Sequence, residues 1–277
     1  SLEGMDLIVG PLYQKNFNIV KDFFYGRQTI VVSPFIKNIN SNYYTDNFFF
    51  MECDELTKIE YLSQYIFDNF FDYNISVVSR DDTTTLKDDY FRNVIFSNVK
   101  EDIKIKNIMT ANKTIDSIHH ELDTIDFKNA ILIPSKEKDF VIDLISKLHA
   151  FKRDSSMVVF CLDDIVKFEQ IPTYELNNLN VHFVSNNNYS YNYNNFIHSF
   201  YNIFKADPRD KYLLTGYKCG KYFLELLLND SNLIDKEVSI LGEKYNFVLQ
   251  ENNFYRNEFF DIWYYDDFEI KRIIRFD

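Results

Sequence analysis

The chain has 277 residues, of which 46% are hydrophobic and 26% charged, and its formal net charge is −12. These proportions are typical of a globular protein that is long enough for one large domain or two lobes. The acidic balance argues against a nucleic-acid-binding surface, which needs clustered Lys and Arg. No apolar run reaches the ~18 residues of a membrane span, so no membrane-spanning segment is expected.

The first two apolar runs are rich in β-branched residues, and each stops at a small residue and a proline. They lie in Met5–Tyr13, which contains Gly10-Pro11, and in Thr29–Pro34, which contains Ser33-Pro34. Such runs are typical of strands buried on both faces of a parallel sheet. The apolar residues between them recur at helical spacing, which predicts a strand–helix–strand crossover. Ligands of open α/β sheets bind outside the carboxyl ends of such strands.

Farther along the chain, helical and extended patterns continue to alternate, and the last part is richer in strands. Helices are expected at residues 56–71, 86–99, 115–122, 140–151, 196–204 and 212–228. A short apolar run lies at residues 48–51, and strands of further βα units are expected at residues 75–79, 103–109, 130–134, 156–160 and 181–184. The tail patterns at 245–250, 259–265 and 268–274 predict antiparallel strands in a meander or hairpin.

The pattern Asp-Leu-Ile-Val-Gly-Pro-Leu-Tyr, followed by Ile-Val-Val-Ser-Pro, resembles a segment of the type I periplasmic binding proteins of the leucine/isoleucine/valine-binding kind. In that family an Ile-Gly-Pro strand precedes a Val-Ser-Pro strand. The segment is most similar to the version in Bacteroidetes envelope proteins, where this domain follows LysM peptidoglycan-binding repeats. The later βα units and the helix containing Gly216-Tyr217 follow the same order, so the resemblance covers nearly the whole chain.

The resemblance implies an α/β fold of two Rossmann-like lobes with parallel sheets, joined by a hinge. On this basis residues 1–73 and 206–240 form the first lobe, and residues 74–205 and 241–277 form the second. A complete domain of the family has two further βα units before the strand that ends at Gly10-Pro11. The first lobe is therefore expected to be N-terminally truncated, with an exposed sheet edge at Asp6–Val9 through which the chain forms a homodimer.

For function, the resemblance implies a non-enzymatic, extracytoplasmic ligand-binding domain in the periplasm or cell envelope, related to the binding proteins of branched-chain amino acid ABC transporters. Carried over by position, the ligand-binding residues around one concavity between the lobes are Tyr13, Ser33, Ser79, Asp81, Asp163 and Tyr217. Tyr13 and Phe35 stand where amino-acid binders keep small groups, which favours a polar or aromatic small molecule. For Ser33 and Tyr217, turn capping and core packing are the competing interpretation.

Other chemistries receive little support from the residues. Asp81-Asp82 and Asp163-Asp164 follow strand ends, where acids can bind a cation or a ligand amine, but a solvated turn is the default explanation for such pairs. The five histidines lack metal-site spacing, and Cys53, Cys161 and Cys219 lack the C-x-x-C pattern, so buried thiols are expected. The chain contains no G-x-S-x-G, G-x-G-x-x-G or P-loop motif. We therefore predict no catalytic residue, cofactor or metal.

Two further functions stay open at this level. One is a cell-wall-associated interaction module that keeps the fold, has lost its small ligand and contacts peptidoglycan or an envelope protein. The other is an α/β enzyme, such as a sugar-transferring one, whose nucleotide site needs acidic residues at strand ends like Asp163-Asp164.

Overall fold

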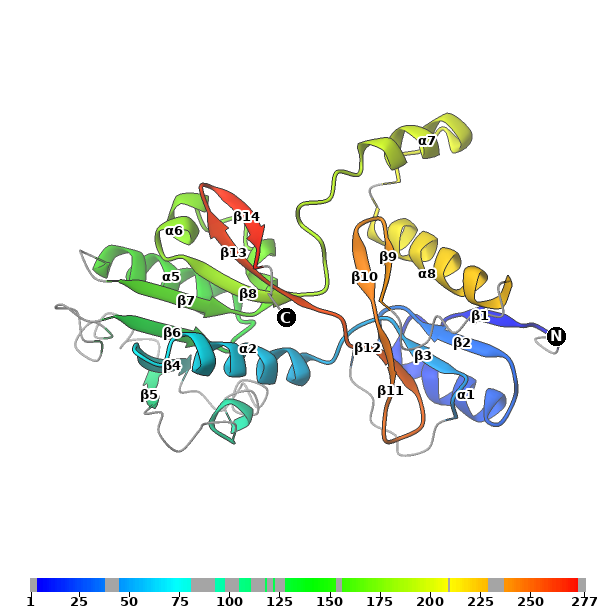
Figure 1. Ribbon diagram of the computed structural model, residues 1–277, viewed down its shortest axis with the longest axis horizontal. Coiled ribbons are helices and arrows are strands. Elements are labelled where there is room, and N and C mark those ends of the chain that lie inside the picture. Colours follow the sequence, from blue (N-terminus) through cyan, green and yellow to red (C-terminus); the bar gives the residue numbers. More distant parts are fainter. Residues whose placement is uncertain are drawn as a thin grey trace. The chain divides into compact units, whose positions relative to one another are not determined.

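A computed structural model describes residues 4–37, 45–80, 93–97, 105–110, 118, 122, 128–152, 156–208, 210–228 and 237–273. The chain divides into two compact units, each built on a sheet of its own (Figure 1). Unit 1 comprises Ser1–Glu55 and Asn186–Phe260, and unit 2 comprises Leu56–Ser185 and Asp261–Asp277. Most of the helices expected at 86–99 and 115–122, and the pair Asp81-Asp82, lie outside the described residues.

Unit 1 contains a five-stranded sheet whose order is β1-β2-β3-β12-β11. Its strands are β1 (Leu7–Val9), β2 (Ile30–Ser33), β3 (Phe48–Phe50), β12 (Tyr255–Asn257) and β11 (Phe247–Leu249). Neighbours from β1 to β12 are parallel, and β11 pairs with β12 in antiparallel orientation. The expected strand–helix–strand crossover is present as β1, α1 (Gln14–Phe24) and β2. A separate hairpin joins β9 (Val238–Ile240) to β10 (Glu243–Tyr245).

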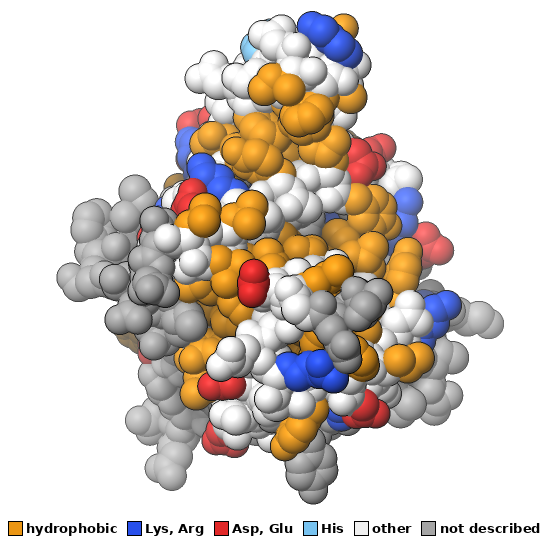
Figure 2. Space-filling view, turned by 90° about the vertical axis from the view of Figure 1, so that its right-hand side faces the viewer, with side chains coloured by type: hydrophobic (Ala, Val, Ile, Leu, Met, Phe, Trp, Pro, Cys, Tyr) orange, Lys and Arg blue, Asp and Glu red, His pale blue; other side chains and the backbone are white. Residues whose placement is uncertain are grey.

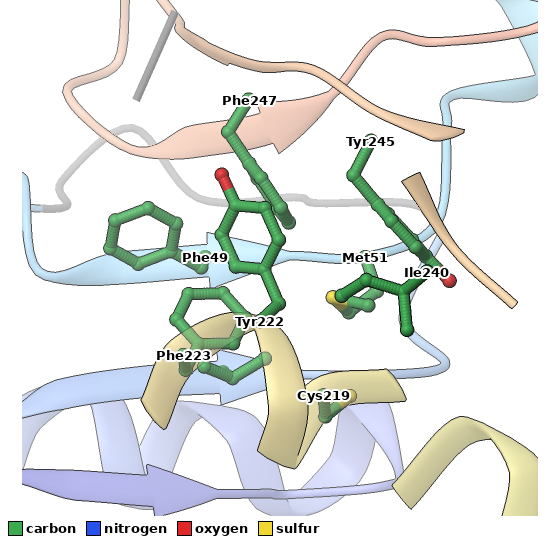
Figure 3. Close-up of a cluster of buried hydrophobic side chains, with 9 residues drawn as sticks. Phe49, Met51, Cys219, Tyr222, Phe223, Ile240, Tyr245 and Phe247 are labelled. Carbon is green, nitrogen blue, oxygen red and sulfur yellow. The ribbon is translucent and has the colours of Figure 1, made fainter. Parts of the chain in front are cut away.

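The run of three phenylalanines in β3 shows why this sheet is buried on both faces. Successive side chains of a strand point to opposite faces, so Phe48 and Phe50 pack with Phe17 of α1, whereas Phe49 packs on the other side. There it meets Phe223 of α8 (Lys211–Leu228) and Phe247 of β11, in the cluster drawn in Figure 3. α1 and α8 therefore cover opposite faces of the unit 1 sheet (Figure 1).

Unit 2 contains a seven-stranded sheet in the order β14-β13-β8-β7-β6-β4-β5. Its parallel strands are β4 (Asn74–Arg80), β5 (Ile105–Thr110), β6 (Asn129–Ile133), β7 (Met157–Cys161) and β8 (Val181–Ser185). The hairpin of β13 (Asp261–Asp266) and β14 (Glu269–Arg272) adds to β8 in antiparallel orientation, as the tail pattern predicts.

Helices cover both faces of the unit 2 sheet (Figure 1). On one side lies α2 (Glu55–Asn69), whose Tyr65 contacts Phe160 of β7. On the other side lie α5 (Lys138–Phe151) and α6 (Thr173–Asn178), which contact each other. A short 3-10 helix, η2 (Asp163–Lys167), follows β7, and neither η2 nor α6 is evident in the sequence pattern.

The boundaries of the units differ from those expected for the lobes. Unit 2 begins at Leu56 rather than at residue 74, because α2 packs on the sheet of unit 2. Residues 186–205, which contain α7 (Asn194–Phe204), and residues 241–260 belong to unit 1. Residues 241–260 belong to the unit 1 sheet because β12 pairs with β3. Helix- and strand-breaking residues in the sequence mark turns. The packing partner of each element decides whether it belongs to unit 1 or to unit 2.

Candidate functional site

The carboxyl ends of β1 and β2 are joined by a side chain that the sequence singles out. Ser33 ends β2 and is buried, and its hydroxyl donates a 3.0 Å hydrogen bond to the carbonyl oxygen of Pro11. Gly10, which precedes Pro11, donates its N–H to the carbonyl of Val32 at 2.8 Å, and the Gly10–Pro11 peptide bond is cis. Ser33 thereby holds the turn that leads from β1 into α1.

The start of α1 carries an exposed aromatic ring at this end of the sheet. Tyr13 is the N-cap residue, and its side chain is exposed and makes no capping hydrogen bond. The first turn of α1 contains no acidic residue. The amino end of a helix carries the positive end of the helix dipole and favours negative charge. The Tyr13 ring and the amino end of α1 therefore lie together at the carboxyl end of β1.

Phe35, two residues after Ser33, contacts the first turn of α8. Its ring meets that of Tyr212 edge-on, with 5.3 Å between centroids. Asp210 caps this turn, because its Oδ1 accepts hydrogen bonds from the N–H groups of Tyr212 and Leu213 at 2.8 and 3.3 Å. The amino end of α8 therefore lies close to the carboxyl end of β2.

Tyr217 lies elsewhere on α8. The helix begins at Lys211, one residue before the start expected from the sequence, so Tyr217 lies in its second turn. Its ring packs on Phe196 of α7, with 4.7 Å between centroids. The structure therefore groups Tyr217 with α7, whereas Tyr13 and Ser33 share the strand ends of unit 1.

In unit 2, Ser79 does not open a loop. It lies inside β4, which continues to Arg80, and it is buried. The Arg80 guanidinium, at the carboxyl end of the strand, forms a 2.5 Å ion pair with Glu137, which follows β6. Asp81 lies outside the described residues.

The acids after β7 are paired with lysines. Asp163 accepts a 2.9 Å hydrogen bond from Lys58 of α2, and both side chains are largely buried. Asp164 forms ion pairs with Lys136 and Lys167. Burial by itself would raise the pKa of Asp164, but the hydrogen bond from Lys167 and the charge of Lys136 hold it below its ordinary value.

The carboxyl ends of β4, β6 and β7 thus form one polar row. Its charged groups are Arg80, Lys136, Glu137, Asp163 and Asp164, and these strands are neighbours in the sheet. Polar groups at the carboxyl ends of adjacent parallel strands lie where open α/β sheets bind ligands. Here the acids are paired with cations of the chain itself, so a ligand amine would have to compete with Lys58 for Asp163.

Sequence reasoning missed a buried ionic network in unit 1. Lys218 of α8 and Glu243 of β10 form an ion pair, and the hydroxyl of Tyr245 donates to Glu243 at 2.9 Å. Tyr193, the N-cap residue of α7, reaches the same carboxylate at 3.5 Å. Burial and the charge of Glu243 raise the pKa of both tyrosines. One feature of the sequence could have revealed this network. Lys218 places a charge beside Cys219 on the apolar face of the predicted helix.

Metal binding and membrane insertion receive no support from the described residues. Among them, no group of three His, Cys, Asp or Glu side chains is placed to hold a metal ion. No helix in the described part of the chain is both long and apolar enough to span a membrane. The thiols of Cys53, Cys161 and Cys219 are buried, as the sequence predicts.

Comparison with known proteins gives likenesses in structure only. No protein-family model and no curated protein sequence matches the chain. It is similar to an ABC transporter substrate-binding protein from Desulfitobacterium hafniense, whose structure contains Leu, with a TM-score of 0.61 and 10% identity over 98% of this chain and 81% of that one. The chain has the fold of a type I periplasmic binding protein.

Two further structures extend this result. A branched-chain amino acid ABC transporter periplasmic ligand-binding protein from Burkholderia xenovorans has a TM-score of 0.64 and 10% identity, over 98% of this chain and 77% of that one. The LpoA C-domain from Haemophilus influenzae, a regulator of PBP1A, has a TM-score of 0.58 and 9% identity, over 98% and 83%. The type I periplasmic binding protein fold expected from the sequence is confirmed, and it occurs both in small-ligand carriers and in a regulator of another protein.

Proposed function

We propose that the chain is a non-enzymatic, extracytoplasmic ligand-binding domain that takes a small polar or aromatic molecule at the carboxyl ends of its parallel strands. The observation that carries the proposal is the start of α1. There an exposed Tyr13 ring, a helix amino end and the Ser33-braced turn lie together at the end of β1. A flat ligand with a carboxylate fits this combination, because the ring offers a stacking face and the helix end favours an anion.

Thermal unfolding with a panel of compounds tests the proposal. The panel contains leucine, benzoate, aromatic amino acids and simple sugars. A ligand present at about 100 times its Kd adds about 2.7 kcal/mol to the stability of the native state. We expect benzoate or an aromatic amino acid to raise the melting temperature and leucine to leave it unchanged. Stabilisation by leucine alone would contradict the predicted ligand class.

Two tyrosines provide a matched pair for this experiment. Tyr13 precedes α1 and Tyr25 follows it, and both rings are more than half exposed. Tyr13→Ala should abolish the ligand-induced rise in melting temperature while leaving the unliganded protein folded. Tyr25→Ala, at the opposite end of the helix, should keep the full rise. Equal responses from the two variants would place the ligand away from the carboxyl end of β1.

A second candidate function is an envelope interaction module that no longer binds a small molecule. The ion pairs favour it, because Asp163 is neutralised by Lys58 and Glu137 by Arg80. The likeness to a domain that regulates another protein supports the same alternative. This candidate predicts that no compound of the panel changes the melting temperature.

A further inference from the structure

The segment that leads from unit 2 into unit 1 has no buried residue over a long stretch. Ser185, at the end of β8, is buried, and the next buried residue along the chain is Pro208. Residues 186–207, which include α7, are partly or fully exposed at every position. At the carboxyl end of α7, Ile203 and Phe204 are 72% and 63% exposed, and Figure 2 shows apolar side chains uncovered at the top of the view, where α7 lies. Burial therefore contributes little to the stability of this segment.

α7 also has little intrinsic stability as a helix. It is 11 residues long, and isolated helices shorter than about 12–15 residues are marginal in water. Its first turn has no acidic residue and its last turn no basic one, so side chains within the helix do not complement its dipole. The ring of Phe200 lies 5.8 Å from that of Phe196 and 4.5 Å from that of Phe204, but pairs four positions apart stabilise a helix only weakly. α7 therefore depends on contacts outside itself.

Contacts made just before α7 converge on one turn, between β9 and β10. The side-chain amide of Asn188 donates a 2.7 Å hydrogen bond to the carbonyl of Gly242. The Tyr191 ring packs directly on the same glycine, and the Tyr193 hydroxyl donates to the Glu243 carboxylate at 3.5 Å. These three contacts to Gly242 and Glu243 form what we call the hairpin latch.

The turn that receives the latch is itself fixed in the core of unit 1. Glu243 is buried, forms an ion pair with Lys218 of α8 and accepts a 2.9 Å hydrogen bond from Tyr245. One ring of α7, that of Phe196, packs on Tyr217 of the same α8, with 4.7 Å between centroids. The latch and this ring contact both lie at the amino end of α7, so that end of the helix is held against the core of unit 1.

We propose that α7 is a conditional helix, which is folded while the hairpin latch is closed and unfolds when the latch opens. Closing the latch fixes the backbone before the helix and brings Phe196 onto Tyr217, which offsets the entropic cost of the first helical turn. Opening removes these contacts, and no buried residue within 186–207 then holds the helix in place. The β9–β10 turn therefore controls the conformation of α7. By linkage, any partner that binds folded α7 also favours the closed latch.

Amide hydrogen exchange, followed by mass spectrometry of peptides from the whole chain, tests the proposal. The protection factors of α7 amides should be at least about a hundredfold below those of α8, but above those of an unfolded peptide. Exchange of α7 should change little with urea below the unfolding transition, because a local opening exposes little surface. An α7 without any protection, or one protected as strongly as α8, would show that the proposal is wrong.

Two variants remove parts of the latch. Tyr191→Ala removes its ring and should speed the exchange of α7 about tenfold, while α8 and unit 2 keep their wild-type rates. Asn188→Ala removes the hydrogen bond to Gly242 and should act in the same direction. Tyr201→Ala is the matched control, because Tyr201 is also an exposed tyrosine but lies within α7, outside the latch. This control should leave α7 protected at least as well as in the wild type, since alanine favours the helix.

The proposal is overturned if neither latch variant speeds the exchange of α7, or if Tyr201→Ala speeds it as much as Tyr191→Ala does. Equal acceleration of α7 and α8 in the latch variants would also overturn it, because the latch would then support the core of unit 1 as a whole. These outcomes do not depend on whether a small ligand binds.

Discussion

His182 shows how burial decides the behaviour of one side chain. It lies in β8, where its ring stacks on Tyr264 at 5.3 Å and packs against Phe160 at 5.2 Å. Its Nδ1 bonds the carbonyl of Asn180 at 2.7 Å. Burial lowers the pKa of His182 to about 4, which the hydrogen bond to Asn180 only partly opposes. The imidazole is therefore neutral at physiological pH and serves as part of the aromatic core of unit 2.

The stability of the protein should fall as the pH decreases from 6.5 to 4. Across this window an unfolded histidine binds a proton and the buried His182 does not, so acid favours the unfolded state by up to about 3 kcal/mol. Carboxyl groups titrate in part of the same pH range. The contribution of His182 is therefore the difference in the pH dependence of unfolding free energy between the wild type and His182→Phe. Urea unfolding of both proteins at several pH values measures it.

The exposed His198 supplies a control for this experiment. It lies on α7, outside any core. His182→Phe should have a shallower dependence of stability on pH than the wild type, and His198→Asn controls for the effect of replacing an exposed imidazole. Equal slopes for the wild type and His182→Phe would show that His182 is protonated in the folded protein.

At the scale of elements, the segment before α7 is attached to the β9–β10 hairpin. Asn188 Nδ2 donates to the carbonyl of Gly242 at 2.7 Å, and the Tyr191 ring covers the same glycine. Gly242 has φ +78, and a Cβ there would lie 2.3 Å from Tyr191 Cδ2. The turn therefore needs glycine both for its backbone conformation and for the ring.

Gly242→Ala should destabilise unit 1 by about 2–4 kcal/mol, because strain at positive φ and overpacking against Tyr191 add together. Gly26 has a similar φ of +71 with no atom within 4 Å of its Cβ position, so Gly26→Ala should show only the backbone strain, about 1–2 kcal/mol. Urea unfolding measures both variants.

A second substitution separates the two causes. Tyr191→Ala in the Gly242→Ala background should recover the overpacking part of the loss, while the same change in the Gly26→Ala protein should not help. A double variant no more stable than Gly242→Ala alone would mean that the ring does not cause the loss.

At the scale of the whole molecule, the two units have separate cores, and the three thiols report on them. Cys53 and Cys219 lie in unit 1 and Cys161 lies in unit 2, and all are buried. Burial raises the pKa of the Cys161 thiol and raises that of Cys219 to about 12. Because the thiolate is the reactive form, the native protein should react very slowly with a thiol reagent.

Thiol labelling in increasing urea should follow the unfolding of each unit. Cys53 and Cys219 should become reactive together, since they belong to one unit although 166 positions separate them in the chain. Cys161 should follow a transition of its own. Peptide mass spectrometry after brief labelling identifies each site. Reactivity of Cys53 in step with Cys161, while Cys219 stays protected, would contradict the division into units.

The sequence predicted many of the local elements from its periodicity, and its resemblance to a known family predicted the fold. Short β-branched runs ending at Gly10-Pro11 and Ser33-Pro34, with helical spacing between them, predict β1, α1 and β2, and the fold of the type I periplasmic binding proteins is confirmed. These features depend on residues close together in the chain, where periodicity and turn chemistry are direct consequences of backbone geometry. The six candidate ligand-binding residues came from the resemblance to the family, and their role in binding stays a prediction.

Tertiary structure decided which partners those residues have. The Ser33 hydroxyl bonds Pro11, Asp163 pairs with Lys58 and Tyr217 packs on Phe196, and each pair joins residues at least 21 positions apart. The same holds for the unit boundaries, because β12 joins the sheet of unit 1 by pairing with β3, some 200 positions earlier in the chain. Such contacts depend on burial and on the three-dimensional order of the strands, which local periodicity does not encode.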